Sequence, residues 1–174
     1  MVKVGIIGCG KIAQVRHIPE YLDNPNAKLT GLYDLNLQRA KELAEKYDCK
    51  FYESVEEMLA DPEIDAVSVC VANHVHAEIT IAALKAGKHV LCEKPFTLCV
   101  DQAEELYELA EEKGLFIMEA FWIRFLPAYD KLRAMLRDGV IGEVKRITSQ
   151  FGFTVEGARR ERKFKSELGG GALL

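Results

Sequence analysis

The stretch that decides the fold is Gly5-Ile6-Ile7-Gly8-Cys9-Gly10-Lys11-Ile12-Ala13. Its second half reads G-x-G-x-x-A, directly after a short apolar run and at the start of a segment with helical spacing. Gly8 can adopt the backbone angles of a tight turn, and Gly10 has no side chain to keep a diphosphate away from the main chain. Ala13 lets the helix pack close to the strand. The context favours a dinucleotide-binding turn over an ordinary strand-to-helix turn.

The residues around this turn predict how such a ligand is held. The helix that begins near Lys11 and Ile12 presents free amide hydrogens and a partial positive charge to the anion. Asp34 ends the second apolar run, where a carboxylate accepts hydrogen bonds from the adenosine ribose and repels a 2′-phosphate. The alternative is that Asp34 caps the following helix, and both can hold. NAD is therefore favoured, but Arg39 could reach a 2′-phosphate or stack on adenine, so NADP stays possible.

Outward from the turn, short apolar runs alternate with longer amphipathic segments. This alternation predicts βαβ units, and hence an α/β fold with a doubly wound, mainly parallel Rossmann sheet. Ser54 and Glu57 form a capping-box pattern at one of the helices. Strands are expected at 4–7, 29–33, 50–52, 66–71, 89–92 and 116–118, and helices at 12–22, 37–46, 54–59, 77–86 and 101–113.

The pattern changes after the sixth expected strand, which places a domain boundary near residue 120. Residues 1–120 are interpreted as the dinucleotide-binding domain. Residues 121–174 are interpreted as the beginning of an α+β domain for substrate binding and dimerisation. A helix is expected at 128–137, and a long alternating segment at 144–153 has the pattern of a strand.

Composition and charge narrow the function classes. The chain has 174 residues and a formal charge of −4, so a nucleic-acid partner is not expected. No apolar run reaches the roughly 20 residues that span a bilayer, and the N-terminus has no secretory pattern, so we expect a cytoplasmic protein without a membrane partner. The five cysteines include no Cys-x-x-Cys pair, which favours core residues in a reducing compartment and argues against a metal site.

Two further motifs carry a resemblance to a known family. Asn73 and His76 follow the fourth expected strand, and Gly87-Lys88-His89-Val90-Leu91-Cys92-Glu93-Lys94-Pro95 includes the fifth. In order and spacing, these motifs and the glycine turn closely resemble the Gfo/Idh/MocA oxidoreductase family over the whole chain. The stretch Met118–Pro127, with the segments at 142–144 and 169–174, is similar to its dihydrodiol dehydrogenase and xylose dehydrogenase branch.

The resemblance implies hydride transfer between nicotinamide and a carbon that bears a hydroxyl or carbonyl, in a sugar, polyol or dihydrodiol-type substrate. Lys94 is the expected catalytic residue, because an ammonium at the carboxyl edge of the sheet can stabilise alkoxide charge or pass a proton. Lys94 and Glu93 are also placed at the cofactor, although Glu93 could equally pair with a cation. Asn73 and His76 are expected to line the cofactor groove, and His76 could instead simply start a helix.

Trp122 and Arg124 resemble family residues near the nicotinamide end, with packing between domains as an equal alternative. The family continues past a Gly-Gly-Gly-Ala-Leu-Leu segment with an aspartate, a glycine and a tyrosine or histidine that exchanges the substrate proton. We therefore expect a truncated chain that is inactive alone. The alternatives are a non-catalytic nucleotide-binding module, such as a redox sensor, and an interaction domain with a vestigial turn. The edge at 144–153 predicts self-association into a homo-oligomer.

Overall fold

The computed structural model describes residues 1–150, 152, 164 and 165. Six parallel strands form one sheet in the order β3-β2-β1-β4-β5-β6, which reverses direction between β1 and β4. This is the predicted doubly wound Rossmann arrangement. The strands are β1 (Val2–Ile7), β2 (Ala27–Tyr33), β3 (Lys50–Phe51), β4 (Ala66–Val69), β5 (His89–Cys92) and β6 (Ile117–Glu119).

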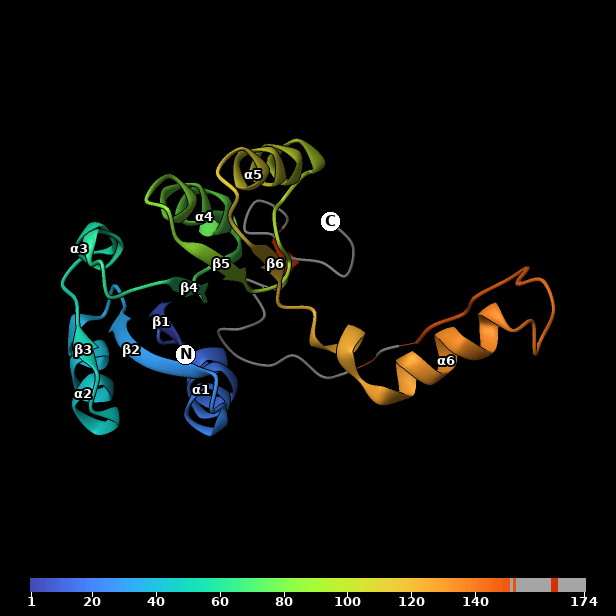
Figure 1. Ribbon diagram of the computed structural model, residues 1–174, viewed down its shortest axis with the longest axis horizontal. Helices are drawn as coiled ribbons and strands as arrows, with labels where there is room; N and C mark the ends of the chain where they lie inside the picture. Colours follow the sequence, from blue (N-terminus) through green and yellow to red (C-terminus); the bar gives the residue numbers. More distant parts are fainter. Residues whose placement is uncertain (151, 153–163, 166–174) are drawn as a thin grey trace.

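Helices cover both faces of the sheet (Figure 1). On one face lie α1 (Ile18–Asp23), preceded by the π-helical turn η1 (Ala13–His17), and α2 (Leu37–Tyr47). The other face carries α3 (Val55–Ala60), α4 (His76–Lys85) and α5 (Val100–Glu112). Three elements remain: η2 (Asn73–Val75), η3 (Trp122–Phe125) and α6 (Pro127–Arg137).

Each face of the sheet has its own hydrophobic core, because successive strand side chains point to opposite faces. Ile6 packs with the helices α1 and α2, and its neighbour Ile7 packs with α3, α4 and α5. Both side chains are fully buried. The central strand β1 is therefore apolar on both faces, as expected for a covered parallel sheet.

Local signals in the sequence are confirmed at the start of α3. The Ser54 hydroxyl accepts a hydrogen bond from the Glu57 amide (3.0 Å), and the Glu57 carboxylate accepts one from the Glu53 amide (2.7 Å). Ser54 therefore caps the helix as predicted, but the second hydrogen bond comes from the Glu53 amide, one residue before the cap, and not from the Ser54 amide of a capping box. All five cysteines are free thiols. None of the helices in the described part of the chain has the length and apolar character needed to cross a bilayer.

The region after β6 agrees with the prediction in its helix and differs from it in the expected strand. The helix α6 forms as expected and extends away from the sheet (Figure 1). Residues 144–150 form no strand, although their alternating pattern predicts one. Alternation shows which face a strand could bury, but a strand forms only where a neighbour pairs with its backbone. Residues 151 and 153 and the segment at 169–174 lie outside the described residues, and the domain boundary near residue 120 stays a prediction.

Candidate functional site

The loops after β1, β2, β4 and β5 meet at the carboxyl edge of the sheet. The Gly8 amide donates to the Tyr33 carbonyl (2.8 Å), and the Cys70 amide donates to the Ile7 carbonyl (2.8 Å). These hydrogen bonds join the end of β1 to the ends of β2 and β4. The strand order reverses here, and in open parallel sheets this reversal is where ligands bind.

The two glycines of the turn have different surroundings. Gly8 has a φ of +98°, and a Cβ there would lie 2.6 Å from the Cys70 carbonyl oxygen. Packing and backbone conformation therefore both require glycine at this position. A Cβ at Gly10 would meet no atom within 4 Å, and its φ lies outside the left-handed region. The fold leaves open space beside Gly10 that packing does not explain.

The helix begins directly after this open space. Lys11 and Ile12 are exposed, whereas Ala13 is fully buried against the sheet. The hydrogen bond from the Gln14 amide to the Gly10 carbonyl (3.1 Å) begins the helical ladder, so the amides of Lys11, Ile12 and Ala13 precede it. The Gln14 side chain also donates to the Cys9 carbonyl (2.8 Å), which fixes the turn.

Asp34 lies at the end of β2 and is only 5% exposed. Its Oδ2 accepts a hydrogen bond from the Cys9 amide (2.7 Å). Its Oδ1 accepts one from the Asn36 amide (2.7 Å) and one from the Arg39 guanidinium (2.6 Å). A carboxylate offers about four acceptor positions, so one position stays open while Arg39 is bound.

Asn36, rather than Asp34, caps α2. Its side-chain oxygen accepts a hydrogen bond from the Arg39 amide (3.1 Å). The Arg39 side chain is 42% exposed, yet its Nε is buried and has no hydrogen-bond partner among the described residues. Asp34 is therefore not needed as a helix cap, and it connects the glycine turn to Arg39.

The segment after β5 places Glu93 and Lys94 at the same edge. Glu93 Oε1 lies 3.0 Å from Nε2 of His17, and these side chains are 12% and 7% exposed. Glu93 Oε2 accepts a hydrogen bond from the Lys94 amide (3.1 Å). The Lys94 side chain is exposed, and the Lys94-Pro95 peptide bond is cis. The structure therefore pairs Glu93 with His17 and leaves Lys94 facing solvent.

Asn73 and His76 occupy different depths in the loop after β4. Asn73 is half-buried at the start of η2. His76 is 1% exposed, and its Nδ1 donates to the Pro95 carbonyl (2.7 Å). Its Nε2 lies 3.3 Å from the Val71 carbonyl oxygen. The structure thus places His76 beneath the surface, where it ties the loops after β4 and β5 together, and not on the wall of the groove.

Trp122 and Arg124 lie after β6, and within the described part of the chain Trp122 contacts an element of the site, whereas Arg124 contacts α6. The Arg16 guanidinium lies 5.7 Å from the centre of the Trp122 ring, so a cation–π contact joins η3 to the helix after the glycine turn. Arg124 is exposed, and its carbonyl accepts a hydrogen bond from Arg133 in α6 (3.1 Å).

Three residues at the site have roles that the sequence did not predict. His17 belongs to none of the sequence motifs, but it contacts Glu93. Gln14 holds the Cys9 carbonyl. Glu119, at the end of β6, accepts a hydrogen bond from the Phe96 amide (2.9 Å) and so fixes the chain after Pro95. These contacts join residues at least 23 positions apart in two of the three cases, and no local pattern signals them.

The buried thiols near the site are not reactive groups. Burial raises the pKa of Cys9 to about 12, with a further contribution from the charge of Asp34. Burial also raises the pKa of Cys92 to about 12 and that of Cys70 well above its ordinary value. Because the thiolate is the nucleophilic form, these cysteines act as core residues.

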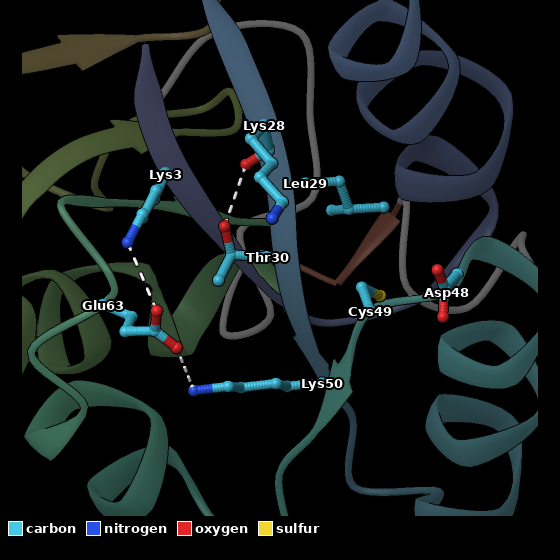
Figure 2. Close-up of a pocket in the computed structure, with 8 residues that line it drawn as sticks. All are labelled: Lys3, Lys28, Leu29, Thr30, Asp48, Cys49, Lys50 and Glu63. Carbon is cyan, nitrogen blue, oxygen red and sulfur yellow. Dashed lines mark hydrogen bonds and ion pairs between the residues drawn. The ribbon is translucent and has the colours of Figure 1, made fainter.

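A separate hollow lies at the opposite, amino edge of the sheet (Figure 2). Lys3 and Lys50 both reach Glu63 there, at 3.3 Å and 2.5 Å. Lys50 also contacts Asp61 at 2.8 Å. Two of the lysines that line this hollow, Lys3 and Lys50, are thus paired with carboxylates. The carboxyl edge therefore remains the candidate site.

Comparison with known proteins identifies the family. The model of an oxidoreductase family with an NAD-binding Rossmann fold matches residues 2–121. The chain belongs to this family, Gfo/Idh/MocA. The resemblance expected from the sequence motifs is confirmed, and the Gfo/Idh/MocA match includes the loops at the carboxyl edge described above.

Two curated relatives align over almost the whole chain. A trans-1,2-dihydrobenzene-1,2-diol dehydrogenase of Xenopus tropicalis is 38% identical over 174 residues, which are 99% of this chain and 52% of the relative. A dTDP-3,4-didehydro-2,6-dideoxy-alpha-D-glucose 3-reductase of Actinomadura kijaniata is 36% identical over 173 residues, again 99% of this chain and 52% of the relative. The chain spans about half the length of the curated relatives it matches.

A solved structure has the same fold as this chain. KijD10, a 3-ketoreductase from Actinomadura kijaniata in complex with TDP-benzene and NADP, in an open conformation, superimposes with a TM-score of 0.76 at 39% identity. The match covers 82% of this chain and 45% of KijD10.

Proposed function

We propose that this chain binds a nicotinamide dinucleotide at the carboxyl edge and presents Lys94 for hydride transfer to or from a sugar, polyol or dihydrodiol-type substrate. The observation that carries the proposal is the open space at Gly10. Neither packing nor backbone conformation requires glycine there, and a closely bound diphosphate does. A bound diphosphate would therefore explain the open space beside Gly10, which the fold alone does not explain.

The residues present fit such a cofactor. The amides of Lys11, Ile12 and Ala13 precede the helical ladder, and the helix N-terminus favours an anion. Asp34 has one acceptor position open toward a ribose hydroxyl. Asn73, at the same edge, would line the groove. Trp122 would lie near the nicotinamide end. The family resemblance suggests the same position for Arg124.

The choice between NAD and NADP depends on Asp34 and Arg39. The carboxylate favours NAD, because it accepts a ribose hydroxyl and repels a 2′-phosphate. Arg39 lies 2.6 Å from that carboxylate and offsets its charge. KijD10 binds NADP. We therefore propose NAD as the preferred cofactor, with NADP also accepted.

Nicotinamide supplies the hydride chemistry when it is bound. The chain's own contribution is the ammonium of Lys94, which is exposed at the end of β5. There it stabilises negative charge on the reacting oxygen or delivers a proton to it. His76 contributes indirectly, because its ring holds the carbonyl of Pro95, the residue after Lys94.

The substrate class is proposed from the relatives, which act on a dihydrodiol and on a dTDP-linked keto sugar. Since the chain spans about half the length of these relatives, we expect the 174 residues to bind cofactor weakly and to show no turnover alone. A dehydrogenase assay with aldoses, polyols and dihydrodiols tests this expectation. Turnover by the purified chain would place a proton donor within these residues.

Fluorescence titration with NADH and NADPH tests the proposal, with Gly10→Ala as the variant. We expect saturable binding by the wild type and an affinity at least about tenfold lower in Gly10→Ala, since the methyl group occupies the space of the diphosphate. The unfolding temperature should stay within about 2 °C, because the new Cβ meets no protein atom. Equal affinities, or no signal with either nucleotide, would overturn the proposal.

A further inference from the structure

The π-helical turn η1 connects the glycine turn to the segment after β5 through His17. The His17 ring and the Glu93 carboxylate lie 3.0 Å apart, and both side chains are almost fully buried. A carboxylate can only accept, so the His17 Nε2–H is the donor. A buried polar pair of this kind fixes geometry strongly, because neither partner has solvent to replace the other.

The Glu93 carboxylate passes this constraint on to Lys94. Its second oxygen accepts a hydrogen bond from the Lys94 amide (3.1 Å). The Glu93 main chain is itself anchored, because its amide donates to the Val69 carbonyl at the end of β4 (2.9 Å). One carboxylate therefore bridges the His17 ring and the backbone of the residue whose ammonium we place at the reacting oxygen.

The position of the His17 ring is fixed from the far side. The centres of the Tyr21 and His17 rings lie 6.3 Å apart. The Tyr21 hydroxyl in turn lies 2.6 Å from the Ser68 hydroxyl in β4. From the same turn, Arg16 reaches over Trp122. Two adjacent side chains of η1 thus contact the two segments that surround the proposed nicotinamide position. Turns of this π type occur frequently at functional sites.

We propose that His17 is a positioning residue that holds Glu93, and through it Lys94, at a fixed place relative to the glycine turn. The diphosphate end and the nicotinamide end of the cofactor groove then share one rigid element, the helix that begins at Lys11. This inference rests on the proposed function, because it assigns a role within the same site.

The test compares two ligands that differ only in the nicotinamide, NADH and ADP-ribose, measured by calorimetry on the full chain. If the wild type prefers NADPH, the 2′-phosphorylated pair is used. His17→Leu should weaken NADH binding by about five- to tenfold, because Glu93 and Lys94 are then no longer held in place for the nicotinamide, while ADP-ribose binding changes less than about twofold. The fluorescence lifetime of bound NADH should shorten as well, since the nicotinamide is held less firmly.

Two matched substitutions separate positioning from a merely structural role. The amide of Gln reaches as far as the histidine Nε2, so His17→Gln should restore NADH affinity and lifetime, whereas the shorter Asn in His17→Asn should not. This pair decides the question even if His17→Leu does not fold. His89→Gln, the same exchange at the amino end of β5, should leave the affinities for both ligands unchanged.

The outcomes are distinct. Equal losses for both ligands, or an Asn variant as good as the Gln variant, would overturn the role of His17 and leave the proposed function standing. A wild type that binds neither ligand would overturn both.

Discussion

At the scale of single residues, the contact between Arg39 and Asp34 sets the charge that a ribose would meet if the cofactor binds as proposed. The carboxylate is buried and receives two main-chain hydrogen bonds, so it stays in place. The Arg39 side chain, in contrast, is 42% exposed. Its Nε is buried and has no hydrogen-bond acceptor among the described residues.

We predict that Arg39→Met changes the cofactor preference. NADPH affinity should fall by about tenfold, because the 2′-phosphate then faces the Asp34 charge without a cation beside it. NADH affinity should change by less than about threefold, since its ribose carries no phosphate. Titrations with both nucleotides measure the change. Lys41→Met removes an exposed charge two residues further along α2 and serves as the control. Equal losses for the two nucleotides in Arg39→Met would contradict the prediction.

At the scale of elements, side chains in or next to β3 and β5 hold the connection between α3 and β4. Lys88, just before β5, is 7% exposed, and its ammonium donates to the carbonyls of Asp61 and Ile64, both at 2.8 Å. Lys50 and Tyr52 contact the carboxylate of Asp61. The Lys88 of the sequence motif is therefore a structural residue at the amino edge, far from Lys94 at the carboxyl edge.

We predict that Lys88→Met destabilises the chain by about 1 to 3 kcal/mol, because two buried carbonyls lose their charged donor. Denaturant unfolding followed by circular dichroism measures this free energy. Lys85→Met, at the exposed end of α4, is the matched control and should cost less than about 0.5 kcal/mol. Similar values for the two variants would show that the Lys88 hydrogen bonds contribute nothing.

The same connection predicts a pH dependence. The pKa of Asp61 lies below its ordinary value of 3.8, first because Lys50 donates to it, then because of the Glu63 amide and the Tyr52 hydroxyl. A carboxyl whose pKa is lower in the folded state stabilises the protein above the unfolded-state pKa, and this stabilisation is lost as pH falls toward the folded-state value. Wild type should therefore be more stable than Asp61→Asn at pH 7, by about 1 kcal/mol.

This stability difference should stay constant down to about pH 5 and shrink below about pH 4. Unfolding temperatures of both proteins from pH 7 to pH 3 measure it, with the exposed Glu45→Gln as the control. A difference that persists unchanged at pH 3 would contradict the assignment.

At the scale of the whole molecule, α6 presents an apolar face that the described residues leave exposed. Tyr129, Leu132 and Met135 follow one another at helical spacing and are 44%, 48% and 41% exposed. We predict self-association through this face, in place of the strand edge expected at 144–153. Light scattering at micromolar concentration should show more than one chain per particle, and Leu132→Glu should reduce the mass. A monomeric wild type would contradict the prediction.

The sequence predicted the elements of the sheet closely, because each has a local signal. The strand of Ile6 and Ile7 is a short apolar run, and the turn at Gly8 interrupts it with the residue that its backbone needs. The alternating segment at 144–150 misled the prediction, since a strand depends on a neighbour that local pattern does not supply.

The candidate site could also be predicted only in part, because local sequence pattern does not show which distant residues pack together. Gly10, Asp34 and Lys94 were placed at the carboxyl edge because each lies within three residues of the end of a strand, and parallel strands bring their ends together. The depth of His76 and the partner of Glu93 could not be predicted, because burial and pairing depend on which loops pack together.

The sequence by itself therefore determined which segments form strands and helices, and where the glycine turn and Lys94 lie relative to them. Hydrophobic spacing and side-chain type are properties of the local chain. Only the tertiary structure decided that His17 meets Glu93, 76 residues away, and that Arg39 covers Asp34. Such contacts form when separate βα units pack side by side, and their geometry exists only in the folded sheet.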